Sequence, residues 1–160
     1  MPESTRTGIV QGKKNFYNKV AGRKNLDKEK EKNMKRAVIS IRSRLILEAV
    51  TLALKRAGFA VEKTSSQSAP EILLACEAAK AHLLVMDVTR NGEGTFDLRM
   101  QTVRSVKAQT PDIKVALLCD KVSDGAIADK VKCAKEEGAI DAFFYESVPS
   151  DYLADALDAL

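Results

Sequence analysis

Short apolar runs alternate with amphipathic helical patterns from Met34 to the last residue of this chain. The apolar runs predict five strands: Arg36–Ile41, Phe59–Glu62, His82–Asp87, Lys114–Cys119 and Ile140–Tyr145. Helical patterns follow each of them: Arg44 to Ala57, the segment opened by Ser68, Phe96–Ala108, the stripe of Ile127, Val131 and Ala134, and the residues after Pro149. Strict alternation favours parallel strands joined by right-handed crossovers, so the sequence predicts a three-layer α/β sandwich with a five-stranded parallel sheet.

The third apolar run, Ala81 to Asp87, ends abruptly in an acid. A run this short and apolar is typical of a strand buried on both faces of a sheet. Ligands and chemistry in such sheets collect at the carboxyl ends of the strands. Asp87 is therefore the first candidate for a functional residue.

Two helix ends carry local signals. Gly58 follows the first helical pattern and predicts a left-handed residue there. Ser68 and Glu71 have the spacing of a capping box, with Pro70 early in the helix.

The chain divides into a basic tail, residues 1–33, and a folded region, residues 34–160. The tail holds nine Lys/Arg and four Asp/Glu, whereas the rest holds 17 basic and 18 acidic residues. With few large aliphatic side chains, the tail is expected to be flexible or partly helical. Its acids interleave with its lysines and its aromatics are only Phe16 and Tyr17, so we expect a solvated segment and no nucleic-acid binding.

Composition excludes several classes of protein. No run reaches the roughly 18 apolar residues of a membrane span, and no apolar segment of a secretory signal is present. The three cysteines have no metal-type spacing, which indicates reduced thiols in a cytoplasmic protein. His82 is the only histidine, so a His-based metal site or catalytic triad has little to build on.

An apolar third strand that ends in Asp87, with a glycine-containing loop after it, resembles the receiver domain of bacterial response regulators. The stretch Gly138-Ala139-Ile140-Asp141-Ala142-Phe143 is similar to the family's approach to strand five, and the likeness covers Lys35 to Leu160. The resemblance implies a flavodoxin-like (βα)5 fold with strand order 2-1-3-4-5. It also implies that Asp87 stands at the position that accepts a phosphoryl group from a histidine kinase.

The sequence departs from the family at the side chains that support this chemistry. Ile41 and Arg42, or Ser40 if the register slips by one place, replace the acidic pair that helps hold Mg²⁺. Cys119 replaces the hydroxyl residue of strand four, and Tyr145 replaces the lysine of strand five. The backbone carbonyl of the family's metal site would come from Thr89.

These replacements weaken the case for phosphorylation. Mg²⁺ prefers several hard oxygen ligands, so Asp87 with one carbonyl would bind it weakly, and we expect no cofactor. Phosphoryl transfer depends on positioning and on positive charge near the phosphate. The side chain of Arg42 could supply some of that charge. Otherwise Asp87 is an inherited acid that pairs with Arg42 or caps the following loop.

Two further site residues have alternative roles. Cys119 is either a redox switch, exposed beside Asp87, or an inert residue at the end of a strand. The acids Asp87 and Asp120 are expected to keep its thiol protonated. The resemblance implies an aromatic on strand five that faces the fourth helix as a rotameric reporter, and this role falls on Phe143. Plain core packing is the alternative for Phe143, Phe144 and Tyr145.

The leading hypothesis is a degenerate receiver domain, or pseudo-receiver, that signals by protein–protein interaction and has no enzymatic activity. Its expected docking face comprises the fourth helix, the fifth strand and the last helix, and its partner would be a histidine kinase or a second copy. One alternative is a working phosphoacceptor receiver that uses Asp87 in a phosphorelay. Another is a flavodoxin-like binder of small molecules at the same strand edge.

Overall fold

The predicted alternation of strands and helices is confirmed in the structure, a computed structural model that describes residues 34–120, 122 and 124–160. The strands are β1 (Arg36–Ser40), β2 (Ala60–Lys63), β3 (Leu83–Asp87), β4 (Lys114–Cys119) and β5 (Ala142–Tyr145). The helices are α2 (Arg44–Arg56), α3 (Ala69–Ala79), α4 (Phe96–Gln109), α5 (Gly125–Glu136) and α6 (Ser150–Asp158), and a 3₁₀ turn, η1, spans Gly92–Gly94. The predicted tail, residues 1–33, lies outside the described residues.

All five strands are parallel, in the order β2-β1-β3-β4-β5, which confirms the flavodoxin-like topology. β3 is the central strand, and the register pairs Ser40 of β1 with Met86 and Leu118 of β4 with Asp87. The ends of β1, β3 and β4 therefore meet at one edge of the sheet, which we call the carboxyl edge.

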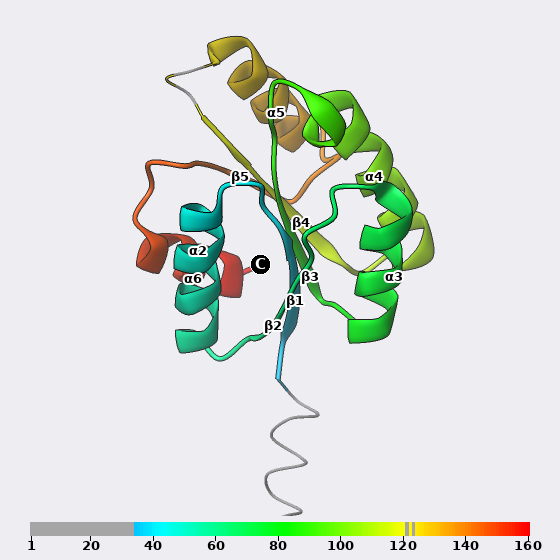
Figure 1. Ribbon diagram of the computed structural model, residues 1–160, viewed down its shortest axis with the longest axis vertical. Coiled ribbons are helices and arrows are strands. Elements are labelled where there is room, and N and C mark those ends of the chain that lie inside the picture. The colour runs from blue at the N-terminus through cyan, green and yellow to red at the C-terminus, as the bar shows by residue number, and fades with distance from the viewer. Residues whose placement is uncertain (1–33, 121, 123) are drawn as a thin grey trace, which may run out of the picture. The chain divides into compact units, whose positions relative to one another are not determined.

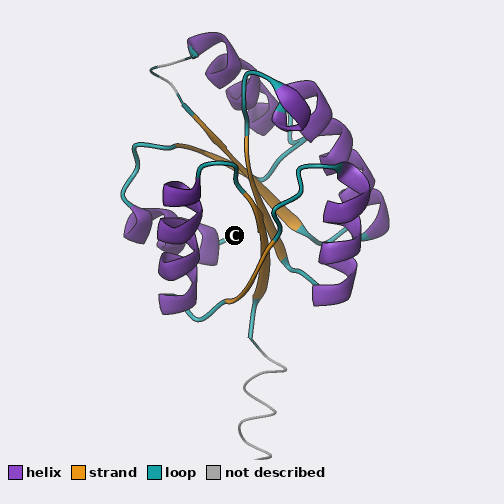
Figure 2. Cartoon of the chain, viewed as in Figure 1, coloured by secondary structure: helices purple, strands orange, loops and turns teal. Residues whose placement is uncertain are grey.

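Helices cover the sheet on both faces (Figures 1 and 2). α2 and α6 lie on one face, and α3, α4 and α5 lie on the other. Each face has its own apolar core, because alternate residues of the buried strands point to opposite sides. Within β3, Leu84 and Met86 pack toward α3, α4 and α5, whereas Leu83 and Val85 pack toward α2 and α6.

The helix ends agree with the sequence in part. Gly58 after α2 has φ +97°, as the sequence predicts, and Pro70 lies in the first turn of α3. The predicted capping box is wrong in its side-chain contact. Ser68 precedes α3, but its hydroxyl accepts from the Ser66 hydroxyl at 3.2 Å and caps no backbone N–H of the helix. The competing contact arises because the serine-rich loop bonds to itself.

Residues Lys35–Leu160 form one compact unit. In the part of the chain that the structure describes, no helix has the length and apolar character needed to cross a bilayer.

Candidate functional site

Asp87 ends β3 at the carboxyl edge, as the sequence predicts, but its carboxylate is nearly inaccessible. The residue is 2% exposed, and every residue of its strand is buried. The chain then continues to pair with β4, because the N–H of Val88 donates to the carbonyl of Leu118 at 2.8 Å. A buried carboxylate is costly unless it is paired and hydrogen-bonded, so its partners define the site.

The ion-pair partner of Asp87 is Arg99, which is fully buried and which projects from α4. Its Nη2 lies 2.9 Å from Asp87 Oδ1, and its Nε donates to the backbone carbonyl of Asp87 at 2.8 Å. One guanidinium thus binds both the side chain and the main chain at the end of β3. This two-point contact is the planar geometry for which arginine is suited.

Arg99 also binds the end of β1. Its Nη1 donates to the Ser40 hydroxyl and its Nη2 to the Ser40 carbonyl, each at 3.1 Å. The Ser40 hydroxyl in turn donates to the carbonyl of Ser66 at 3.0 Å. We call Asp87, Arg99 and Ser40 the buried ion-pair network; it ties α4 to the ends of two adjacent strands.

The predicted ion pair between Asp87 and Arg42 is wrong. Arg42 contacts Asp87 through its backbone N–H, which donates to Oδ2 at 2.9 Å, while its side chain is exposed. Together with Arg99, this contact engages both oxygens of the Asp87 carboxylate. Asp87 pairs instead with Arg99, which reaches it from within the fold because Arg99 lies on the core-facing side of α4.

Sequence analysis missed Arg99, although a signal existed. Phe96, Met100 and Val103 form the apolar stripe of the predicted helix, and Arg99 lies three residues after Phe96 and four before Val103. A charge at that spacing falls on the buried face of the helix. Since a charge is almost never fully buried without a partner, the sequence indicated a missing counter-ion.

Burial and the ion pair act in opposite directions on Arg99. Burial lowers the pKa of its guanidinium, while the charge of Asp87, the hydrogen bond to it and the charge of Glu93 raise it. Such pairs form only with full hydrogen bonding on both sides. In the described residues, every buried side-chain nitrogen or oxygen has a partner.

Cys119 is completely buried at the end of β4, which does not fit the exposed position that the redox-switch alternative requires. Its Sγ lies 3.8 Å from the carbonyl oxygen of Phe144. Burial, followed by the charges of Glu146 and Asp120, raises the pKa of its thiol to about 11. The acids that act on it are therefore Glu146 and Asp120; the contribution expected from Asp87 is not among the causes. A protonated thiol is a poor nucleophile, so this environment does not favour redox reactivity.

Tyr145 lies beside Cys119 in the sheet register and is half-buried. Its ring meets that of Phe143 edge to face, with centroids 5.8 Å apart and planes at 79°. Both rings pack against the core under α3, α4 and α5. An aromatic ring supplies no positive charge at the position where the receiver family has a lysine.

Thr89 lies in the loop after β3. Its N–H donates to the carbonyl of Gly94 at 2.8 Å, and its hydroxyl donates to the carbonyl of Asn91 at 2.9 Å. These bonds close the loop on itself.

The donor groups present do not fit a Mg²⁺ ion. Both Asp87 oxygens already accept hydrogen bonds, and the end of β1 supplies Ile41 and the cation-bearing Arg42 instead of acids. Among the described residues, no cluster of three or more His, Cys, Asp or Glu side chains has an arrangement that could hold a metal. A hard divalent ion needs several oxygen ligands, and here the guanidinium of Arg99 already occupies one oxygen of Asp87, the only buried carboxylate among the described residues.

The half of the carboxyl edge over β4 and β5 is acidic. Glu146 follows β5, and its N–H donates to the carbonyl of Cys119 at 3.0 Å. Partial burial raises the pKa of Glu146, and the negative charges of Asp120 and Asp87 raise it further. Negative charge therefore accumulates over β4 and β5.

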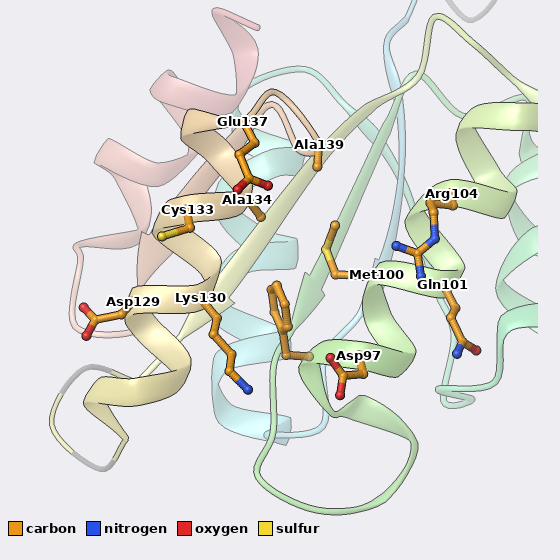
Figure 3. Close-up of a pocket in the computed structure, with 11 residues that line it drawn as sticks. Asp97, Met100, Gln101, Arg104, Asp129, Lys130, Cys133, Ala134, Glu137 and Ala139 are labelled. Atoms are coloured by element: carbon orange, nitrogen blue, oxygen red, sulfur yellow. The ribbon is translucent and has the colours of Figure 1, made fainter.

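A separate hollow lies between α4 and α5 (Figure 3). Asp97, Gln101 and Arg104 of α4 line one side of it; Asp129, Lys130 and Cys133 of α5, with Glu137 directly after that helix, line the other. Its lining mixes both signs of charge, and none of its residues belongs to the buried ion-pair network.

Comparison with known proteins supports the fold. No protein-family model and no curated protein sequence matches the chain. Solved structures do match. A response regulator from Thermotoga maritima is 21% identical, with a TM-score of 0.61 over 79% of this chain and 96% of its own. This is the fold of a response-regulator receiver domain.

Other receiver structures agree equally well. The chemotaxis protein CheY4 of Vibrio cholerae is 20% identical, with a TM-score of 0.61 over 79% of this chain and 98% of its own. The response regulator TrrA of Thermotoga maritima, solved in complex with Mg²⁺ and BeF, is 17% identical, with a TM-score of 0.60 over 79% and 98% of the two chains. At these identities the likeness establishes the receiver fold.

Proposed function

We propose that this chain is a receiver-fold signalling domain that acts by binding proteins and that does not use Asp87 as a phosphoacceptor. One observation carries the proposal: both oxygens of the Asp87 carboxylate are engaged, one by the buried Arg99 and one by the N–H of Arg42. An internal cation thus stands beside the carboxylate, where receiver chemistry would need a metal and an incoming phosphate.

Phosphoryl transfer to Asp87 would be opposed at two levels. The attacking oxygen would first have to leave a hydrogen-bonded ion pair that is shielded from water, and breaking such a pair is costly. The developing charge on the phosphate would then meet Cys119 and Tyr145, which provide neither a hydroxyl of strand four nor a lysine of strand five. Transfer of this kind depends on electrostatic support at the reacting oxygens.

The proposed docking face comprises α5, β5 and α6. β5 is an edge strand, and Phe143, Phe144 and Tyr145 on it are half-buried. α6 adds Tyr152, which is 64% exposed. Aromatic residues at a free sheet edge favour protein contacts, so a histidine kinase or a second copy of the chain is the expected type of partner. The proposal assigns no cofactor, no nucleic-acid binding and no enzymatic activity, and it places the domain in the cytoplasm.

The decisive experiment is a phosphorylation assay read by intact-protein mass. The full chain is incubated with acetyl phosphate and Mg²⁺, beside a receiver domain that has a complete site as positive control. We expect no phosphoryl adduct on this chain under conditions that load the control. The matched variant Asp87→Asn identifies the position of any adduct. A stoichiometric adduct that is lost in Asp87→Asn would overturn the proposal and establish a phosphoacceptor.

A further inference from the structure

A groove at the carboxyl edge lies next to the buried ion-pair network. The loop after β1 and the start of α2 supply Arg42 and Arg44, and the loop after β2 supplies Ser65, Ser66 and Gln67; Glu93 from η1 completes it. We call this the switch-point groove. In a parallel sheet of order 2-1-3-4-5, the strand order reverses between β1 and β3, and ligands bind in the crevice where the loops after these two strands separate.

The groove offers donors for an anion. The side chains of Arg42 and Arg44 are both exposed, and neither takes part in an ion pair within the part of the chain that the structure describes. Ser65, which lines the groove with them, is also exposed. Two guanidinium groups with a hydroxyl provide the multiple donors that a phosphate group accepts.

The groove is also connected directly to the buried network. Arg42 donates its backbone N–H to Asp87 Oδ2 at 2.9 Å, and the carbonyl of Ser66 accepts from the Ser40 hydroxyl at 3.0 Å. Glu93 acts on Arg99 through its charge. The segments that contain Arg42 and Ser66 are therefore hydrogen-bonded to the network, and Glu93 acts on it through its charge.

We infer that the switch-point groove binds the phosphate group of a small molecule, and that Arg42 and Arg44 are the residues that hold it. The bound anion would restrain the loops after β1 and β2, and these loops carry the contacts to Asp87 and Ser40. Occupancy would thus change the conformation of the carboxyl edge without any covalent modification of Asp87. This inference extends the proposed function by naming the signal.

The test is a nuclear magnetic resonance titration of the ¹⁵N-labelled full chain with sodium pyrophosphate, at ionic strength held constant with sodium chloride. We expect saturable shifts of the backbone amides of Arg42, Arg44 and Ser65–Gln67, with a smaller shift at Asp87. The double variant R42Q/R44Q should weaken binding at least about tenfold, because it removes two charge-assisted contacts. Arg56→Gln, at the exposed far end of α2, should leave the affinity unchanged.

A second arm replaces pyrophosphate with ADP. Tighter binding of ADP with the same shifts would identify a nucleotide-like ligand, and equal binding would identify the phosphate group alone; both support the inference. Absence of saturable shifts in the groove, or equal weakening by Arg56→Gln, would overturn it. The titration does not involve phosphorylation of Asp87, so its outcome is independent of the mass assay that tests the proposed function.

Discussion

The two halves of the carboxyl edge, one over β1 and β3 and one over β4 and β5, differ in how their negative charges are compensated. Over β1 and β3, Asp87 is buried beside Arg99, and the pair is fully hydrogen-bonded. Over β4 and β5, partial burial raises the pKa of Glu146, and the negative charges of Asp120 and Asp87 raise it further. A receiver fold thus holds one half of its edge neutral from within and leaves the other half acidic.

The difference shows how a fold can fix the place of an acid while the residues around that acid set its charge environment. Asp87 has the same place in the fold whether or not it reacts, because the end of β3 fixes it. Arg99 occupies one oxygen of this carboxylate and binds the main-chain carbonyls at the ends of β1 and β3. The neutral half is therefore expected to be structural, and the acidic half to respond to pH.

The largest predicted effect is the loss of Arg99. Arg99→Ala leaves Asp87 buried without its counter-ion, and it removes bonds to the carbonyls of Asp87 and Ser40. We expect the free energy of unfolding to fall by about 3–5 kcal/mol. Urea denaturation at neutral pH measures it directly.

Lys107 provides the matched control, because it lies on the same helix and joins Asp141 at 2.8 Å in a partly exposed ion pair. Lys107→Ala should cost no more than about 1 kcal/mol. Equal losses in Arg99→Ala and Lys107→Ala would show that the buried pair contributes no more to the free energy of unfolding than a partly exposed pair. That result would remove the contrast between the two halves.

The next effect is the coupling between the two partners. Asp87→Leu strands a buried cation, Arg99→Met strands a buried anion, and the double variant replaces both charges with apolar groups. We expect the double variant to be more stable than either single variant, with an interaction energy of about 2–3 kcal/mol. Denaturant unfolding of all four proteins gives the value, and purely additive losses would contradict a direct pair.

The architecture was predictable because it depends on patterns of apolar and turn-forming residues that are visible in the sequence. The uniformly apolar Leu83–Met86 segment required burial on both faces, and Gly58 marked the end of α2. The predicted capping box at Ser68 was wrong because the hydroxyl of Ser68 instead accepts a hydrogen bond from the Ser66 hydroxyl in the same loop. Local competition of this kind cannot be judged from spacing alone.

The site was predictable in position but not in its contacts. The register of β1 and β3 brings Arg42 to Asp87, as expected, yet it is the main-chain N–H that makes the contact. Arg99 comes from a helix that crosses over the sheet, so its distance from Asp87 depends on tertiary packing. The place of Arg99 on the apolar stripe of α4 was the one available indication. It predicted a buried charge but not the residue that pairs with that charge.

Thiol reactivity tests whether the edge over β4 is closed. Burial raises the pKa of both Cys119 and Cys76 to about 11, whereas Cys133 is exposed. At pH 8 a disulfide reagent should react first with one thiol per chain, and with the other two at least about tenfold more slowly. Mass mapping should place the fast label on Cys133, and complete labelling in urea provides the control. Rapid labelling of Cys119 would restore the redox-switch hypothesis.

The smallest predicted effect concerns the acidic half. A folded-state pKa raised above that of the unfolded chain means that ionisation of Glu146 opposes folding, so its contribution to stability is lost as pH rises through the folded pKa. Glu146→Gln removes this penalty and should stabilise the protein at pH 7. Because the residue is half-buried and screened by water, the gain should be at most about 0.5 kcal/mol. At a pH below the unfolded-state pKa, where the carboxyl is protonated in both states, the variant and the wild type should unfold alike. An equal gain at both pH values would locate the effect in packing and would contradict the raised pKa of Glu146.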